Sequence, residues 1–457
     1  MKKITFIMIR KCKYLIITSL ILGFLGCKNE PQIVGTWKMN NNILGLFDKN
    51  TYIEWSPEFD GFESPGTWKL DNDTLKLYFY GRPDEERKLV ILEHTNKSIK
   101  VKNLKDSSIV DMQFMKGYEW AENIDGLSEP EKNFEKFWQD FDKNYAFFEL
   151  RNVDWKAIYK KFRPLVNEAT SDSLLYEYFK QMISPFDDGH TRLDRGREGE
   201  RPFITAKQPS HRFTKLFSEE ERIELRKITQ ETLGKNGCKN IKQSLNGAVS
   251  YCKSNDYSYV KFSRFFAMPT EQIESSLDTI INYISDSSYL IIDIRENYGG
   301  HDEIAYQFAN RFADKKRIGH LVRRRNDKGH ESFNDYKVNY LDPSTKQTYT
   351  KPIYLLTSSS VFSAAEIFLI AMRSLPHVTV IGNNTKGMLS EMAEYVLFNG
   401  WDYQLSSQRI YSSDTICYEK FGVPPDQKVL HTRQDLVKRI DPLIINALQM
   451  YKIRKID

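Results

Sequence analysis

From residue 257 onward, apolar runs that read as buried strands alternate with stretches of helical periodicity. The runs are YSYVKFSRF, YLIIDIRENYGG, KPIYLLTS and VTVIGN, and the amphipathic stretch TEQIESSLDTIINYI stands between the first two. Strands that alternate with helices form parallel sheets joined by right-handed crossovers. The pattern therefore predicts an α/β domain over residues 256–457, with its reactive loops beyond the carboxyl ends of the strands.

Three segments with different patterns of apolar and polar residues precede this domain. Residues 27–122 show period-two alternation between turn clusters, as in IVGTWKM, GTWKLDNDTLKLYFY and SIKVKNL, which predicts a small antiparallel sheet or barrel. Residues 126–195 have helical periodicity, and a capping-box pattern of Ser128 with Glu131 marks where this helical part begins. Residues 196–255 are charged and mixed, and they read as an insertion with some helix.

The first 26 residues have the composition of a secretory signal. Five basic residues and no acid accompany the apolar run YLIITSLILGFLG. This run is too short to span a membrane as a helix, which takes about 20 residues. Gly26 before Cys27 resembles the lipobox of bacterial lipoproteins, although Phe24 stands where leucine is usual. Cys27 would then be acylated and tether the protein to a membrane surface; the alternative is plain secretion with cleavage near Cys27.

The charge balance argues against a nucleic-acid partner. The chain has 66 Lys and Arg residues against 61 Asp and Glu residues, a net charge of +5. The five basic residues of the signal segment account for the whole excess. A mature chain of balanced charge does not suggest a surface that binds phosphates.

Three cysteines follow Cys27. Cys238 and Cys252 either close a short loop as a disulfide or remain two thiols, and their spacing fits no zinc or redox motif. Cys417 is expected to be an unpaired, buried residue rather than a nucleophile.

Two loops carry the candidate nucleophile and its base. Ser363 stands where the strand IYLLTS gives way to an apolar helix, so its hydroxyl would lie at the positive end of the helix dipole. An ordinary N-cap serine would show the same pattern. A serine needs a base, and His190 after the turn Asp-Asp-Gly is one candidate, with His301 as its rival.

Two further loops would complete such a site. The backbone N–H groups of Gly299 or Gly300 could form an oxyanion hole with that of Ala364, although the two glycines could equally make only a tight turn. Glu419 precedes the rigid turn Gly-Val-Pro-Pro and could orient an imidazole.

Taken together, these loops resemble a known family. From about Phe134 to Val429 the chain is similar to the serine peptidases related to the C-terminal-processing (tail-specific) proteases and the tricorn core. DDGHTRL, LIIDIRENYGG, SSSVFSAAEIF, VIGNNTKG and FGVPPD occur in that family's order. The resemblance implies a ClpP/crotonase-like parallel-sheet peptidase core with a helical N-terminal subdomain.

A second resemblance covers the segment before the helical part. The sequence Gly-Thr-Trp-Lys occurs at Gly35 and again at Gly66, as at the strand starts of the small lipocalin-like domains of bacterial lipoproteins. The implied all-β barrel either holds a ligand or is filled with side chains, and we expect the filled form.

The family resemblance assigns roles to the candidate residues. It implies that Ser363 is the nucleophile, and that Gly299 or Gly300 joins Ala364 in binding the oxyanion. The tail-specific branch uses a lysine base, but Met388 occupies that place, so the Ser/Lys dyad is not matched.

The tricorn-like Ser/His/Glu branch is matched instead. In that branch His190 is the base and Glu419 orients it, while Lys386 remains a minor candidate base.

These roles imply a serine endopeptidase that hydrolyses unfolded proteins or peptides in the bacterial cell envelope through an acyl-enzyme, without a metal or organic cofactor. No Gly-Leu-Gly-Phe-like loop of a PDZ module occurs between His190 and Tyr257, so recognition of a free C-terminus does not carry over. The alternative is a surface lipoprotein that binds peptides or apolar ligands without cutting them.

Overall fold

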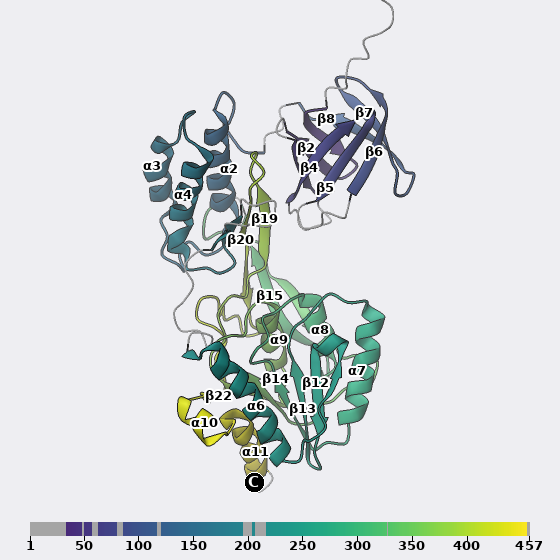
Figure 1. Ribbon diagram of the computed structural model, residues 1–457, viewed down its shortest axis with the longest axis vertical. Helices are drawn as coiled ribbons and strands as arrows, with labels where there is room; N and C mark the ends of the chain where they lie inside the picture. The colour runs from purple at the N-terminus through teal and green to yellow at the C-terminus, as the bar shows by residue number, and fades with distance from the viewer. Residues whose placement is uncertain are drawn as a thin grey trace, which may run out of the picture. The chain divides into compact units, whose positions relative to one another are not determined.

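The chain forms two compact units, Met1–Tyr118 and Glu119–Asp457 (Figure 1). The computed structural model describes residues 33–47, 50–56, 63–79, 86–116, 120–194, 203–205, 216–326 and 328–454. The expected signal segment 1–26 and Cys27 lie outside the described residues. Within the described ranges, no helix combines the length and apolar character needed to cross a membrane.

The N-terminal unit is a closed barrel of eight antiparallel strands. Each strand pairs with the next one along the chain, and β8 closes the barrel against β1. The strands are β1 (Gly35–Met39), β2 (Asn42–Leu46), β3 (Thr51–Trp55), β4 (Glu63–Asp71), β5 (Thr74–Phe79), β6 (Glu86–His94), β7 (Ser98–Asn103) and β8 (Ile109–Phe114). The small all-β barrel predicted from the alternating pattern is confirmed.

Side chains pack the inside of this barrel. The indole N–H of the buried Trp37 donates to the carbonyl of Ile33 at 2.8 Å. Gly66 in β4 has no room for a side chain, because a Cβ there would collide with the Tyr52 ring and the carbonyl oxygen of Tyr78. The buried apolar cluster further includes Met39, Leu44, Leu46, Leu75, Leu77, Leu89, Ile91, Ile99, Val101 and Met112.

The C-terminal unit is built on a seven-stranded sheet of order β11-β12-β13-β14-β17-β18-β22. The strands from β13 to β22 run parallel, whereas β11 and β12 pair antiparallel. Their bounds are β11 (Lys242–Ser244), β12 (Val249–Lys253), β13 (Tyr257–Phe262), β14 (Tyr289–Asp293), β17 (Ile353–Thr357), β18 (Val378–Gly382) and β22 (Gln427–Lys428). The parallel α/β core expected from the alternating strands and helices is confirmed.

Helices cover both faces of this sheet (Figure 1). One face, which includes Val260 and Leu355, packs against α7 (Thr270–Ile284), α8 (Asp302–Asn310) and α9 (Ala364–Arg373). The other face, which includes Tyr259 and Leu356, packs against α6 (Glu219–Lys235) and α11 (Pro442–Arg454), with α10 (Arg433–Lys438) just before α11. Because both faces are covered, the central strands β14 and β17 are apolar except at their last residues, Asp293 and Thr357.

Three helices form the helical subdomain, residues 129–186. They are α2 (Glu129–Asn144), α3 (Trp155–Phe162) and α4 (Asp172–Ile183), and two 3₁₀ turns follow α3 and α4. The expected capping box of Ser128 and Glu131 is present at the start of α2. The aromatic stripe of α2 is core packing, since the Phe137 ring lies 4.1 Å from Phe179 and 5.0 Å from Tyr403, centroid to centroid.

Two smaller antiparallel sheets complete the C-terminal unit. One has the order β10-β9-β20-β19 and the other β16-β15-β21. Their strands are β9 (Arg192–Asp194), β10 (Phe203–Thr205), β15 (Arg317–Arg324), β16 (Lys337–Leu341), β19 (Met392–Val396), β20 (Asp402–Ser406) and β21 (Gln408–Tyr411). Tyr403 lies on β20, so the first of these sheets packs against the helical subdomain.

The segment expected as an insertion, residues 196–255, also supplies α6, β11 and β12. A domain boundary at residue 256 therefore cuts through the main sheet. Pattern reasoning missed these strands because β11 is only three residues long and lies at the sheet edge, where its lysine and glutamine are exposed. A disulfide between Cys238 and Cys252 joins the segment after α6 to β12, and Cys417 is a half-buried free thiol.

Candidate active site

Ser363 lies between β17 and α9 in a backbone conformation that residues with side chains rarely adopt. Its φ is +57° and its ψ is −138°. Its backbone N–H donates to the carbonyl of Met388 at 2.9 Å, and its hydroxyl makes no capping hydrogen bond to α9. An ordinary N-cap serine would use its hydroxyl for the helix, so the N-cap explanation does not account for Ser363. Positive φ at such a residue stores strain, which is typical of functional sites.

The loop after β14 lies directly against Ser363. Gly299 has a φ of +89°, and a Cβ on it would lie 2.8 Å from the Ser363 Cβ and 3.0 Å from the Ala364 nitrogen. Asn297 holds this loop by accepting the Gly299 N–H at 2.9 Å and donating to the carbonyl of Phe262 at 3.1 Å. The structure thus brings Gly299 next to the candidate nucleophile, while Gly300, the next residue of the same loop, lies against the backbone of Phe265.

The backbone N–H groups that are candidates for binding the oxyanion differ in the hydrogen bonds that they already make. The Gly299 N–H already donates to Asn297, whereas Gly300 takes part in a parallel bridge with Phe265 that uses the Gly299 carbonyl and the His301 N–H. The Ala364 N–H is the first of helix α9, so it has no acceptor within the helix. Gly300 and Ala364 are therefore the better-suited pair of backbone donors.

His190 is buried at the end of a tight turn, with 4% of its surface exposed. Asp188 in the same turn accepts the His190 backbone N–H at 2.9 Å. Burial lowers the pKa of His190 to about 4, against the pull of Asp188, so the imidazole is neutral at neutral pH. In the described part of the chain its Nδ1 has no hydrogen-bond partner.

Glu419 is buried in the same region but its carboxylate is bound to other groups. Oε1 accepts from Arg151 at 2.8 Å, and Oε2 accepts the backbone N–H groups of Leu389 and Ser390 at 2.8 and 3.3 Å. Burial raises the pKa of Glu419, and the guanidinium of Arg151 opposes that shift. Glu419 thus reaches the turn of His190 through Arg151, and not by a direct hydrogen bond to the imidazole.

One segment, residues 385–390, connects the candidate nucleophile to Glu419. The Met388 carbonyl accepts from Ser363, and the next residue, Leu389, donates to Glu419. Glu366 on α9 anchors this segment, because its carboxylate accepts from Thr385 Oγ1 and from the N–H groups of Gly387 and Met388. Burial raises the pKa of Glu366 to about 7.

The two minor candidate bases lie differently. The ammonium of Lys386 lies 3.9 Å from the ring centre of Phe362, and its charge contributes to the lowered pKa of His190. His301 is an exposed residue at the start of α8, and its backbone N–H donates to the carbonyl of Phe265. The side chain of Met388, at the place of a dyad lysine, is buried.

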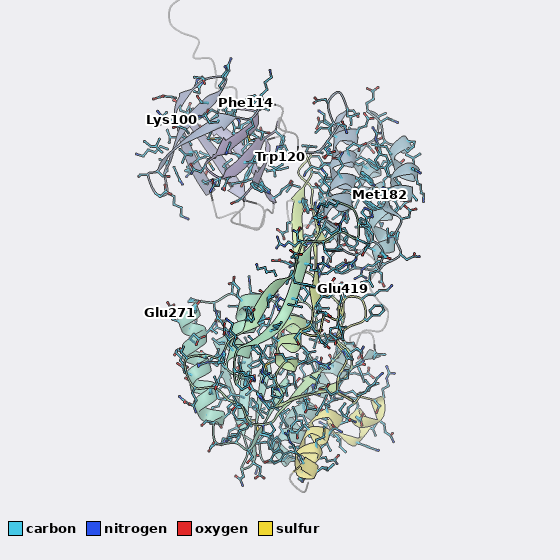
Figure 2. The ribbon with its side chains drawn as sticks, turned by 180° about the vertical axis from the view of Figure 1, so that it is seen from behind. Lys100, Phe114, Trp120, Met182, Glu271 and Glu419 are labelled. Carbon is cyan, nitrogen blue, oxygen red and sulfur yellow. A yellow bond between two sulfur atoms is a disulfide. The ribbon has the colours of Figure 1, made fainter. Side chains whose placement is uncertain are left out.

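Sequence reasoning missed two members of this cluster. Asp188 was visible only as part of a turn, and Arg151 follows α2 almost forty positions before His190 with no motif around it. Figure 2 shows Glu419 between the helical subdomain, where Met182 is labelled, and the α/β core, where Glu271 is labelled. Across the described ranges, no group of three or more His, Cys, Asp or Glu side chains is arranged to hold a metal ion.

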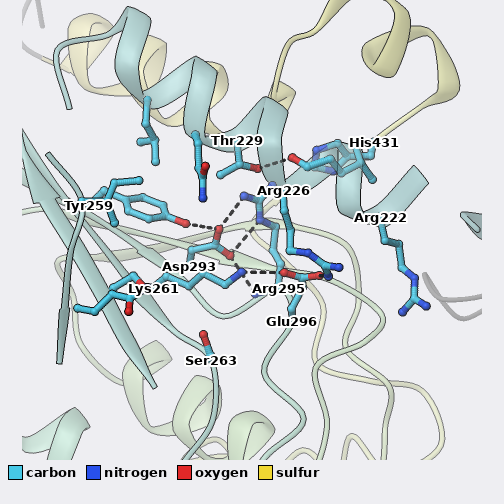
Figure 3. A pocket seen from close by; sticks show the side chains of 16 residues that line it. Arg222, Arg226, Thr229, Tyr259, Lys261, Ser263, Asp293, Arg295, Glu296 and His431 are labelled. Carbon is cyan, nitrogen blue, oxygen red and sulfur yellow. Dashed lines mark hydrogen bonds and ion pairs between the residues drawn. The ribbon is translucent and has the colours of Figure 1, made fainter. Parts of the chain in front are cut away.

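A separate cavity of about 180 Å³ lies between α6 and the sheet (Figure 3). Its charged lining is paired internally: Arg226 and Lys261 each contact Glu296 at 2.7 Å, and Arg295 binds Asp293. This cavity is on the face covered by α6 and α11, whereas Ser363 begins α9 on the other face. It is therefore distinct from the cluster around Ser363.

Comparison with known proteins agrees with this geometry. Residues 256–429 match peptidase family S41, and residues 128–184 match the tricorn protease C1 domain. The carboxy-terminal processing protease CtpA of Bacillus subtilis (strain 168) is 25% identical over 181 residues, which are 39% of this chain and 36% of CtpA. The match thus spans only about a third of that relative.

Solved structures show a similar fold. A candidate peptidase from Parabacteroides merdae ATCC 43184 has 27% identity and a TM-score of 0.58, over 71% of this chain and 96% of that chain. Mature CPAF in complex with lactacystin, at 11% identity, a TM-score of 0.50 and coverage of 71% and 98%, is similar in fold alone. The chain therefore carries a domain of peptidase family S41, a family of serine peptidases, with a tricorn protease C1 domain ahead of it.

Proposed function

We propose that this chain is a serine endopeptidase with Ser363 as its nucleophile and His190 as its general base. The observation that carries the proposal is the state of Ser363: a half-buried serine, held at positive φ, whose hydroxyl does not cap α9 and whose Cβ lies against Gly299. A strained serine at a strand-to-helix turn, next to the first backbone N–H of a helix, is suited to acyl transfer.

The mechanism follows from the properties of these groups. Neutral His190 takes the hydroxyl proton while Ser363 Oγ attacks the peptide carbonyl carbon. The backbone N–H groups of Gly300 and Ala364 stabilise the oxyanion that forms. The imidazolium then gives its proton to the departing amine as the C–N bond breaks, and water resolves the acyl-enzyme by the same steps in reverse order.

Glu419 acts in this scheme as a buried acid near the base, and burial raises its pKa to about 8. Because Arg151 and two backbone N–H groups occupy its oxygens, Glu419 acts on the imidazolium through Arg151 and through space. A direct hydrogen bond to His190 would require Glu419 to exchange one of these partners during turnover.

The proposed substrates are unfolded proteins or peptides in the bacterial cell envelope. A carboxy-terminal processing protease among the relatives supports a polypeptide substrate. Attachment through a lipid on Cys27 rests on the sequence Leu-Gly-Cys after an apolar run. Metabolic labelling with a fatty-acid probe tests it: label that disappears in Cys27→Ser supports the anchor, and label that persists contradicts it.

A fluorophosphonate probe tests the catalytic assignment, because it reacts with activated serines. The mature protein should label at neutral pH, whereas Ser363→Ala and His190→Ala should not. Ser360→Ala is the matched control, because Ser360 lies in the same loop and its buried hydroxyl has no hydrogen-bond partner among the described residues. A folded wild type that fails to label, or a Ser363→Ala protein that still labels, would contradict the proposal.

A second measurement distinguishes His190 from Lys386. Lys386→Ala should keep most of the labelling rate, because the ammonium contacts the Phe362 ring. Loss of labelling in Lys386→Ala with retention in His190→Ala would assign the base to the lysine.

A further inference from the structure

The side chain of Arg151 is buried where three segments of the C-terminal unit meet. It comes from the loop between α2 and α3, and 2% of it is exposed. Its Nη2 donates to Glu419 at 2.8 Å, its Nη1 donates to the carbonyl of Asp187, and its Nε lies 3.9 Å from the Asp188 carboxylate. One guanidinium therefore joins the turn that carries His190 to the carboxylate of Glu419.

Asp188 is the second acid in contact with this guanidinium. Its Oδ1 accepts the backbone N–H of His190 at 2.9 Å, and its Oδ2 accepts the hydroxyl of Tyr145 at 2.9 Å. Tyr145 follows α2, so the helical subdomain holds the turn of His190 through both Arg151 and Tyr145. Asp187 in this turn is left-handed with a φ of +48°, and the Thr191 N–H donates to the Asp188 carbonyl at 3.2 Å.

The charges of this cluster fit the proposed chemistry. Burial raises the pKa of Glu419 to about 8, so this carboxyl group is mostly protonated at neutral pH, whereas the pKa of Asp188 is lowered. With Asp188 ionised, Arg151 charged and His190 neutral, these three groups carry no net charge, and the Asp188 carboxylate favours the positive charge that His190 gains with the Ser363 proton. A buried charge is tolerated only where it is paired, and the guanidinium of Arg151 holds the pKa of Asp188 below its usual value against the effect of burial.

We infer that Arg151 is a positioning residue of the active site, which holds the turn of His190 and the Glu419 carboxyl group in place and keeps the neighbouring Asp188 ionised. The inference rests on the serine peptidase chemistry proposed above. It gives the tricorn C1 segment a direct part in the site, since Arg151 lies within residues 128–184. An arginine suits this place better than a lysine, because its planar fork reaches several acceptors at once.

The charged groups around His190 set the direction of the test. Asp188 raises the pKa of His190, whereas Lys386, Arg151 and Arg192 lower it. Glu419 faces Arg151, Asp188 and the buried Glu366. Removing the guanidinium therefore raises the pKa of His190 and of both acids, and the base stays protonated up to a higher pH.

The experiment measures the second-order rate of fluorophosphonate labelling from pH 4 to 8 in the full mature protein, with Arg151→Met and Arg151→Lys. We expect Arg151→Met to lower the plateau rate by about 100-fold, because misplaced catalytic groups cost that much. The acid limb of its profile, which is the fall of the labelling rate toward low pH, should move to a pH about one unit higher. Arg151→Lys should keep the acid limb near that of the wild type, with an intermediate plateau rate.

Arg163→Met is the matched control. Arg163 lies in the same subdomain and pairs with Glu131 and Glu135, away from His190. Its replacement should change thermal stability without moving the acid limb or the rate of the folded fraction. Rates are normalised to the number of labelled sites at completion, so partial unfolding of a variant lowers the end point and not the rate.

The outcomes separate this inference from the proposed function. A shifted acid limb in Arg151→Met that Arg151→Lys restores supports the positioning role. A folded Arg151→Met protein with the rate and pH profile of the wild type overturns it while the proposed function stands. If Arg151→Met does not fold, an Arg151→Lys protein with the wild-type rate overturns it. A folded wild type that never labels overturns the proposed function and this inference together.

Discussion

Ser363 holds a backbone conformation that glycine adopts more easily than any other residue. The strain of a non-glycine residue at φ +57° and ψ −138° is of the order of 1–3 kcal/mol. We predict that Ser363→Gly has a free energy of unfolding about 1 kcal/mol higher than Ser363→Ala, since glycine removes the strain and loses part of the gain as chain entropy. Denaturant unfolding of the two inactive variants measures the difference. Equal stabilities would mean that the turn is relaxed in the folded protein.

The buried imidazole of His190 predicts an unusual pH dependence for the wild type. Its pKa is lowered to about 4 from the usual 6.5, so the neutral form that can accept a proton persists well below neutral pH. We predict that the fluorophosphonate labelling rate is flat from pH 8 to about 5 and falls only below that. Stopped-time labelling across this range measures the profile. A fall centred near pH 6.5 would show that the base is solvated or is another group.

At the residue scale, the sequence could predict the groups that belong to motifs. Ser363, Gly299 and Gly300 follow strands of the parallel sheet, where such sheets place their reactive loops, and His190 stands in a turn between the helical subdomain and β9. Arg151 could not be found in this way, because its role depends on how the helical subdomain packs on the core. The hydrogen-bond partners of Glu419 likewise depend on packing. The sequence could suggest that Glu419 orients His190, but it could not show that Arg151 joins Glu419 to the turn of His190.

At the scale of elements, α9 and the segment 385–390 act together. Glu366 accepts two backbone N–H groups and the hydroxyl of Thr385. In Glu366→Gln, an amide group would face at least one of these donors, so we predict a loss of about 1–3 kcal/mol in the free energy of unfolding. The labelling rate should also fall, because Met388 would no longer be held against Ser363.

The control for this change is Glu303→Gln. Glu303 lies in the first turn of the neighbouring helix α8 and is exposed, so its replacement should leave stability and labelling unchanged. Thermal melts and labelling rates of both variants are measured side by side. If the two variants behave alike, Glu366 does not anchor the segment.

The elements differ in how far the sequence could predict them. The strands β13, β14, β17 and β18 are covered on both faces, so their apolar runs are unmistakable. β11, by contrast, is a short edge strand with exposed polar residues. Its pairing depends on β12 beside it, and no local pattern marks such a strand.

At the scale of the whole molecule, the two units have separate hydrophobic cores. The buried cluster of the barrel contains only residues of the N-terminal unit, and the two clusters of the main sheet contain only residues of the C-terminal unit. The apolar residues change from period-two alternation to helical periodicity near residue 122, and this change predicted the division from the sequence. What the barrel does could not be predicted, because a packed barrel serves many purposes.

Separate cores predict that the C-terminal unit folds and reacts without the barrel. A domain with its own core and its own catalytic groups needs no contact from a neighbour to reach its native structure. Residues 119–457 produced alone should therefore melt cooperatively and label with the fluorophosphonate at the rate of the full mature protein. The matched control is the same fragment with Ser363→Ala, which should melt alike and not label. A fragment that folds but labels much more slowly would mean that the barrel contributes to the site, and it would move the search for substrate contacts to the N-terminal unit.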